Sequence, residues 1–120
     1  MSNSQISIQD RTRNFANRVI KVYVELNKRK YDDAGRVLSK QFLRSGTSIG
    51  ANCCEAEFAQ SRADFRSKLT IALKEASETR YWILLLIDNN IIPESKLAMM
   101  LDELNQIIKI LIATTKKLKE

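Results

Sequence analysis

Apolar and small side chains recur at alternating spacings of three and four residues along almost the whole 120-residue sequence. This spacing places them on one face of an α-helix. No stretch alternates like a strand, and three glycines and one proline are too few for a turn-rich β protein. The pattern predicts helices over residues of about 7–27, 34–59, 62–88 and 93–118. We expect one all-α domain over residues 1–120, an antiparallel up-down four-helix bundle.

Polar segments and capping residues separate the predicted helices. The first connection is the charged stretch Asn27–Asp33. Ser61 and Asp64 form a capping-box pattern, in which the serine accepts from an early helical N–H and the acidic residue reaches back. Asp88–Asn90 supplies residues that tolerate a left-handed cap, and Pro93 suits the first turn of the next helix. These signals predict where the three connections fall.

The last two predicted helices carry more apolar residues than one bundle core needs. Tyr81–Ile87 is apolar for seven residues in succession, and Ile107–Ile112 is nearly so. A helix that is apolar all round must be covered all round, whereas a small bundle covers only its inward side. We therefore expect a homo-oligomer. The candidate interface consists of Trp82, Leu84, Leu85, Ile110 and Ile112.

Positive charge is concentrated in the first third of the sequence. Residues 1–44 hold ten Lys and Arg against four Asp and Glu, a net charge of +6, whereas residues 45–120 hold ten of each. Lys and Arg bind phosphates without sequence preference, and this binding weakens steeply with salt. The candidate nucleic-acid contacts are Arg11, Arg18, Lys21, Lys28, Arg29, Lys30, Arg36 and Lys40.

Two other interpretations of this basic surface stay open. It is a solvated face that keeps the protein soluble, or it binds an acidic partner protein. The phenylalanines and Tyr23 fall mostly on or near apolar helix faces, so the sequence shows no evident platform for stacking single-stranded bases.

The stretch GTSIG at residues 46–50 fits the G-x-S-x-G nucleophile elbow of serine hydrolases. A serine nucleophile needs a base, usually histidine, and the sequence contains no histidine. The elbow also needs a preceding strand, whereas helical periodicity continues from Leu38 to Ala56. We therefore expect no enzyme. Gly46 and Gly50 instead favour the close approach of another helix, with a break or kink near Gly46 as the alternative.

A polar contact between the second and third helices is also predicted. If these helices turn near residue 60, positions that sum to about 120 face one another. Arg44 then lies near Glu75 or Glu78, so we expect an interhelical ion pair with one of them. If the pair is buried, removing Arg44 would cost about 3–5 kcal/mol.

The sequence predicts neither a metal nor a cofactor. Paired-carboxylate bundles need Glu-x-x-His sets, and no glycine-rich loop ends in the Gly-Lys-Ser/Thr of a P-loop. Adjacent Cys53 and Cys54 rarely bond to each other and fit a reducing compartment. Met1–Asp10 lacks the order of a signal peptide, and the longest apolar run is far short of a membrane span. We expect a soluble, cytoplasmic protein.

Several short motifs between Leu43 and Ile87 together carry a family likeness. They are Arg44-Ser45, Ser48-Ile49, Asn52, Glu55-Ala56, Asp64-Phe65, Ile71-Ala72-Leu73 and Glu78. The combination resembles the four-helix bundle proteins first met as open reading frames in intervening sequences of large-subunit ribosomal RNA genes. The likeness extends more loosely over about residues 8–118. Cys53 departs from it, because the family often has an aliphatic residue there.

The resemblance implies a cytoplasmic bacterial protein, commonly a barrel-like homopentamer, with no established enzymatic activity. A distant relative is the accessory protein of diversity-generating retroelements, a basic pentamer that binds nucleic acid and a reverse transcriptase. The implied partners are RNA or DNA and a nucleic-acid-processing protein. We therefore expect a non-enzymatic homo-oligomeric scaffold that binds RNA or DNA. The alternative is a protein interaction module with an acidic partner and no nucleic acid.

Overall fold

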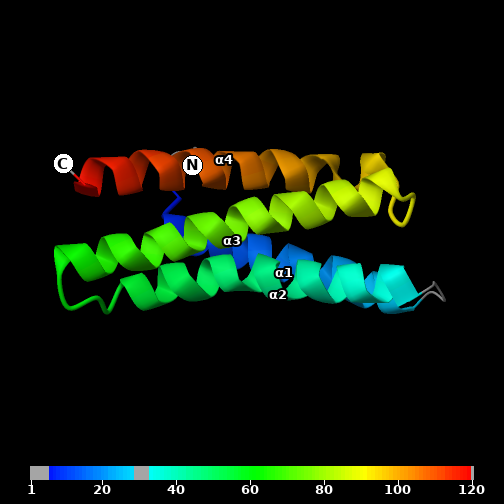
Figure 1. Cartoon of the computed structure of the whole chain (residues 1–120), viewed down its shortest axis with the longest axis horizontal. Helices are drawn as coiled ribbons and strands as arrows, with labels where there is room; N and C mark the ends of the chain where they lie inside the picture. The colour runs from blue at the N-terminus through cyan, green and yellow to red at the C-terminus, as the bar shows by residue number, and fades with distance from the viewer. Residues whose placement is uncertain (1–5, 29–32, 120) are drawn as a thin grey trace.

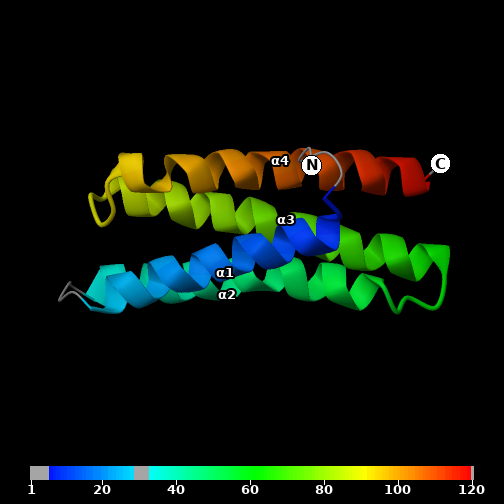
Figure 2. The ribbon, with the colours of Figure 1, turned by 180° about the vertical axis from the view of Figure 1, so that it is seen from behind.

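Four long helices make up the fold. The computed structural model describes residues 6–28 and 33–119. Figure 1 shows each helix running antiparallel to the one before it, and Figure 2 shows the same arrangement from behind. The described residues contain no strand. The helices are α1 (Ile8–Asn27), α2 (Asp33–Ala56), α3 (Arg62–Asp88) and α4 (Glu94–Lys119).

Helices that follow one another in sequence are neighbours in space. α1 packs on α2, α2 on α3 and α3 on α4, and α4 closes the bundle on α1. Within the described parts of the chain, the diagonal pairs α1–α3 and α2–α4 make no backbone contact. The bundle measures 47 × 30 × 20 Å. The all-α four-helix architecture predicted from the sequence is confirmed.

Local signals set the helix ends. Ser61 accepts a hydrogen bond from the backbone N–H of Asp64 at 3.0 Å, as a capping serine does. The Asp64 carboxylate accepts from the N–H of Gln60 (3.2 Å), one residue outside the predicted box. α3 ends beside Asn90, whose φ of 58° lies in the left-handed region. α4 begins after Pro93, not at it.

The second helix is shorter than the periodicity predicts. It ends at Ala56, three residues before the predicted end. The N–H groups of Glu57, Phe58 and Ala59 donate to carbonyls three residues back, so the chain leaves the helix in tight turns. Phe58 is therefore outside the bundle core and is largely exposed.

α1 and α2 pack closely because α2 presents glycine to α1. A Cβ atom on Gly46 would lie 2.8 Å from a methyl group of Val19, and one on Gly50 would lie 3.1 Å from the carbonyl oxygen of Thr12. α2 continues through both glycines without a break. The predicted close approach is confirmed, and the helix does not break at Gly46.

The apolar runs Tyr81–Ile87 of α3 and Ile107–Ile112 of α4, which we call the apolar belt, are partly covered within the chain. In α3, Ile83 and Leu86 are fully buried, while Tyr81 remains 56% exposed. In α4, Leu111 is fully buried, while Ile112 remains 50% exposed. One bundle therefore shields more of this belt than the sequence suggested. Other exposed apolar residues lie outside the belt: Ile20, Val24, Val37 and Met99.

Candidate nucleic-acid interface

The junction of α1 with α4 is the most open in the bundle. These two helices approach each other at fewer positions than any other neighbouring pair. Figure 2 shows them diverging toward the end where α1 stops and α4 starts. A hollow of about 450 Å³ opens there. It is lined by Lys21, Val22, Glu25 and Leu26 of α1, by Lys28 just after the end of α1, and by Ile92, Lys96 and Leu97.

Two more hollows continue along the same junction. One of about 440 Å³ lies at the start of α1 and is lined by Ile6, Ile8, Arg11, Gln106, Lys109 and Ile110. A smaller one of about 110 Å³ shares Ile6 and Arg11 with it and reaches Arg18 and Glu103. We call this line of three hollows the α1–α4 seam. It follows nearly the whole length of α1.

Two carboxylates in the seam are already neutralised. Glu25 pairs with Lys28, with 3.0 Å between Oε1 and Nζ. Glu103 pairs with Arg11, with 3.5 Å between Oε1 and Nη1. Four exposed cations remain, and none forms an ion pair with any residue that the structure describes. They are Arg18, Lys21, Lys96 and Lys109. The seam thus carries a net positive charge of four.

Arg11 does not belong to the exposed basic surface. The residue is only 7% exposed, and its Nη1 also donates to Gln106 Oε1 at 3.2 Å. It therefore cross-links α1 to α4 and is not open to a phosphate. The sequence placed Arg11 on the same stripe as Arg18, but the stripe runs under α4 at this point. This correction removes Arg11 from the candidate contacts.

The remaining predicted cations do not share one surface. Lys28 lines the seam but is paired. Arg36 and Lys40 are exposed on α2, which makes no contact with α4, and Arg36 pairs with Asp33. They would form a separate contact. Arg29 and Lys30 lie outside the described residues. The structure instead adds Lys96 and Lys109, which the sequence-based set omitted.

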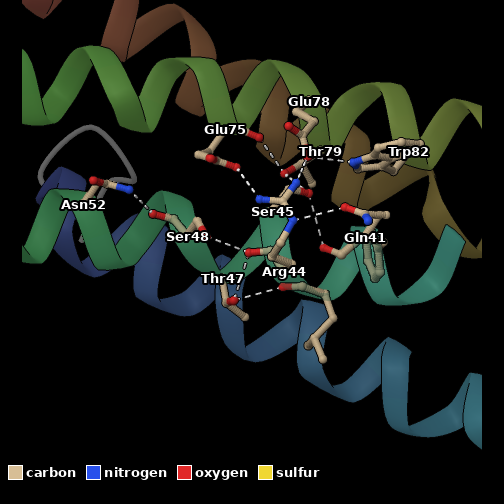
Figure 3. Close-up of polar contacts among 12 residues, drawn as sticks. Gln41, Arg44, Ser45, Thr47, Ser48, Asn52, Glu75, Glu78, Thr79 and Trp82 are labelled. Atoms are coloured by element: carbon tan, nitrogen blue, oxygen red, sulfur yellow. Dashed lines mark hydrogen bonds and ion pairs between the residues drawn. The ribbon is translucent and has the colours of Figure 1, made fainter. Parts of the chain in front are cut away.

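A polar cluster joins α2 to α3 on another side of the bundle (Figure 3). The Arg44 guanidinium bonds to Glu75 Oε2 at 3.4 Å and also to Glu78. Its Nε donates to Gln41 at 3.1 Å, and Trp82 Nε1 donates to Glu78 at 3.0 Å. The structure thus contains both contacts that the sequence left as alternatives. The Arg44 side chain is 48% exposed, so the pair is not buried within one chain.

Apolar and aromatic side chains flank this cluster. The ring of Trp82 meets that of Tyr81 edge to face, with centroids 5.4 Å apart. Val37 lies one and two helical turns before Gln41 and Arg44 and is 58% exposed. Leu85 follows Trp82 by one turn and is half-buried. We call Val37, Arg44, Tyr81, Trp82 and Leu85 the tryptophan face. Its composition resembles that of protein-interface hot spots, which are rich in Trp, Tyr and Arg.

The predicted interface residues lie on several faces. Trp82 and Leu85 belong to the tryptophan face, whereas Ile110 lines a hollow of the seam. Leu84 is half-buried on α3 and Ile112 is exposed on α4. Successive positions of a helix point in different directions, so an apolar run places its members on all sides.

Two basic residues that the sequence did not single out cap the end of α4. Arg62 donates to the backbone carbonyls of Lys117 and Leu118, each at 3.4 Å. Arg66 donates to the carbonyl of Thr115 at 3.1 Å. The last carbonyls of a helix have no partner within it, and cations there are favourable. These arginines therefore stabilise the α3–α4 junction.

The described residues contain no recognisable catalytic or metal constellation. Ser48 donates to the carbonyl of Arg44 at 2.8 Å, within its own helix. Burial raises the pKa of the Cys53 thiol, and a hydrogen bond with Thr12 partly opposes this. No group of three His, Cys, Asp or Glu is placed to hold a metal in residues 6–28 and 33–119. Across the same ranges, no helix is long and apolar enough to cross a membrane.

Fold and surface together define a helical bundle with a basic seam on one side and an aromatic face on another. The chain belongs to the 23S rRNA-intervening sequence protein family, whose model matches residues 4–113. It is similar to a protein of unknown function from the S23 ribosomal protein family of Bacteroides thetaiotaomicron, known from a crystal structure. The two chains are 46% identical with a TM-score of 0.84, over 92% of this chain and 99% of the other. Comparison with curated proteins gives no match.

Proposed function

We propose that this protein is a non-enzymatic, self-associating cytoplasmic scaffold that binds the backbone of RNA or DNA along the α1–α4 seam. The observation that carries the proposal is a set of four exposed cations in the seam, which form no ion pair with the described residues: Arg18, Lys21, Lys96 and Lys109. Phosphate oxygens are the ligands that exposed Lys and Arg bind without regard to base sequence.

The spacing of these cations suits a chain of phosphates. Lys96 and Lys109 are thirteen residues apart, about 20 Å along α4. Arg18 and Lys21 stand on the opposite rim, about 4.5 Å apart along α1. If all four contact phosphates, the logarithm of the binding constant falls with the logarithm of salt with a slope of about −3 to −4.

The tryptophan face supports self-association. Its side chains are large, rigid and partly exposed, and a second copy would cover them. A face that meets a different face of the next copy generates a ring when the rotation between copies closes, and the family resemblance favours a ring of five members. A ring would repeat the seam around its circumference. Several weak seams acting together bind one long strand more tightly than a single seam does.

Charge reversal tests the seam. The variant Lys21→Glu/Lys96→Glu/Lys109→Glu should abolish the gel shift of a 40-nucleotide RNA at low salt. The matched control Lys74→Glu/Arg80→Glu/Lys116→Glu changes net charge equally, from +6 to 0, at exposed positions outside the seam. It should keep the shift. Equal loss in both variants would show that only overall charge matters.

Light scattering tests self-association. A pentamer has a mass of about 69 kDa, five times the 13.8 kDa of one chain. Val37→Glu/Tyr81→Glu should reduce the mass to that of a single chain. Ile20→Glu/Val24→Glu, which alters equally exposed apolar residues of α1, should not. A wild-type mass of 13.8 kDa would exclude the assembly.

The apolar side chains that line the hollows favour one alternative function, the binding of an acidic protein partner. Val22, Ile8 and Ile110 line the same hollows as the cations, and an acidic protein segment with apolar residues could use both. Absence of any shift with RNA or DNA, even at low salt, would favour this acidic partner. The partnership with a nucleic-acid-processing protein rests on the family resemblance alone.

A further inference from the structure

We infer that the α1–α4 seam selects single-stranded over double-stranded nucleic acid. The inference rests on the proposed function and specifies its ligand. Its basis is that the same hollows are lined by both cations and apolar side chains, so the seam offers space as well as charge.

The two larger hollows are alike in size and chemistry. Each holds about 440–450 Å³, within the range of ligand-binding clefts. Val22 lines one together with Lys21 and Lys96. Ile8 lines the other together with Lys109. Ile8 and Val22 are both half-buried and stand about 21 Å apart along α1.

An unpaired base can use this space, whereas a paired base cannot. Single strands turn their bases outward, and aromatic or apolar side chains cover the exposed faces. A duplex keeps its bases stacked inside and presents mainly phosphates. It is too bulky to enter hollows of about 440–450 Å³. A duplex would therefore contact only the cations. A single strand would also place its nucleobases against the apolar side chains that line the hollows.

A continuous partner helix fits the seam less well. Helix-in-groove binding uses apolar anchors at i, i+3 or i+4, and i+7 along an unbroken stripe. Here Arg11 crosses from α1 to Glu103 and Gln106 between the hollows and interrupts the stripe. Leu26 and Leu97 line the first hollow but are almost fully buried within the chain, so they offer little surface to a partner helix. The exposed cations therefore carry most of the available interaction.

The seam also predicts weak discrimination among bases. The apolar side chains that line the two larger hollows are aliphatic, and Phe15, which lines the smallest hollow, is fully buried. Among the described residues that line the seam, no exposed aromatic ring therefore provides a stacking platform. Aliphatic side chains cover any base without reading its hydrogen-bonding edge. We expect single strands of different sequence to bind within a few-fold of one another.

Fluorescence anisotropy with a labelled 12-nucleotide RNA and its blunt duplex tests the inference on the wild-type chain. The single strand should bind at least ten-fold more tightly at equal salt. Val22→Thr/Ile110→Thr keeps the charge and should weaken single-strand binding several-fold while leaving duplex binding unchanged. Val24→Thr/Ile112→Thr, at exposed positions that line none of the three hollows, is the matched control and should change neither.

The outcomes separate the inference from the proposed function. Equal affinity for strand and duplex would overturn single-strand selection and leave the proposed function intact. Absence of binding to both would overturn the two together. An acidic amphipathic peptide that binds the seam and is unaffected by competing RNA would also overturn the inference, in favour of a protein partner.

Discussion

The backbone of Thr12 lies directly against Gly50, so that a Cβ atom on the glycine would be 3.1 Å from the Thr12 carbonyl oxygen. Backbone cannot move aside as a flexible side chain can. The contact therefore fixes the distance between α1 and α2. One turn earlier in α2, Gly46 meets a side chain instead: a Cβ atom on it would lie 2.8 Å from a methyl group of Val19.

We predict that Gly46→Ala destabilises the fold despite its better helix propensity. The new methyl group would lie 2.8 Å from a Val19 methyl, and Val19 is fully buried and stiff at χ1. Overpacking costs about 1–3 kcal/mol, offset by about 1 kcal/mol of propensity. Urea denaturation should show a net loss of up to about 2 kcal/mol. Val19→Ala should be less harmful in the Gly46→Ala background than alone, and strict additivity would contradict the clash.

Arg44→Ala should lower the free energy of unfolding of the isolated chain by about 1 kcal/mol or less. Its side chain is half exposed, so solvent screens its pairs with Glu75 and Glu78. If the tryptophan face is covered in an assembly, the loss should grow, because the carboxylates would be left buried and unpaired. Thermal unfolding above and below the assembly concentration separates the two cases. Arg44→Lys should restore only part of the lost free energy of unfolding, because lysine lacks the planar guanidinium group that can donate to both carboxylates at once.

The hydroxyl groups of Ser45 and Thr79 form a hydrogen bond of 2.9 Å between α2 and α3, in the fully buried core. Thr79→Val removes one partner and should cost about 1–3 kcal/mol in the free energy of unfolding. Removing both hydroxyls, in Ser45→Ala/Thr79→Val, should cost no more than Thr79→Val alone. A double variant as unstable as the sum of the singles would show that the bond is not the cause.

The two cysteines should differ in reactivity. Cys53 is buried and Cys54 is exposed. Because burial raises the pKa of the Cys53 thiol, the thiolate that attacks reagents is disfavoured. We expect one thiol per native chain to react with a disulfide reagent at pH 8, and two after denaturation. Rapid reaction of both in the native protein would contradict the packing around Cys53.

The raised pKa of the Cys53 thiol predicts that the free energy of unfolding decreases at high pH. A folded-state pKa above the unfolded value favours the protonated thiol in the native state. Its contribution is therefore complete below about pH 8.5 and is lost as pH rises further. Cys53→Ala should unfold with a smaller decline between pH 8 and pH 10 than wild type.

Local patterns foretold much of the fold. The periodicity of apolar residues predicted four helices, and Ser61 was correctly predicted to cap the third. The ion pair between Arg44 and Glu78, across the connection of α2 to α3, was predicted as one of two alternatives. Each of these features depends on neighbours in the sequence or on one short connection. Such information is present in the residues themselves.

The seam could not be read in the same way. Arg11 and Arg18 share one helical stripe, yet only the packing of α4 buries the first and leaves the second exposed. Lys96 and Lys109 join the basic surface because α4 closes the bundle on α1, about ninety residues away in sequence. Contacts between the first and last helices depend on the whole arrangement and leave no local signal.

Amine-acetylation footprinting with mass spectrometry tests the central claim most directly. Wild-type protein is labelled with and without a saturating single-stranded RNA at low salt. Binding along the α1–α4 seam predicts protection of Lys21, Lys96 and Lys109, with Lys74 and Lys116 labelled equally in both samples. Protection spread evenly over all five lysines, or confined to Lys74 and Lys116, would contradict the account.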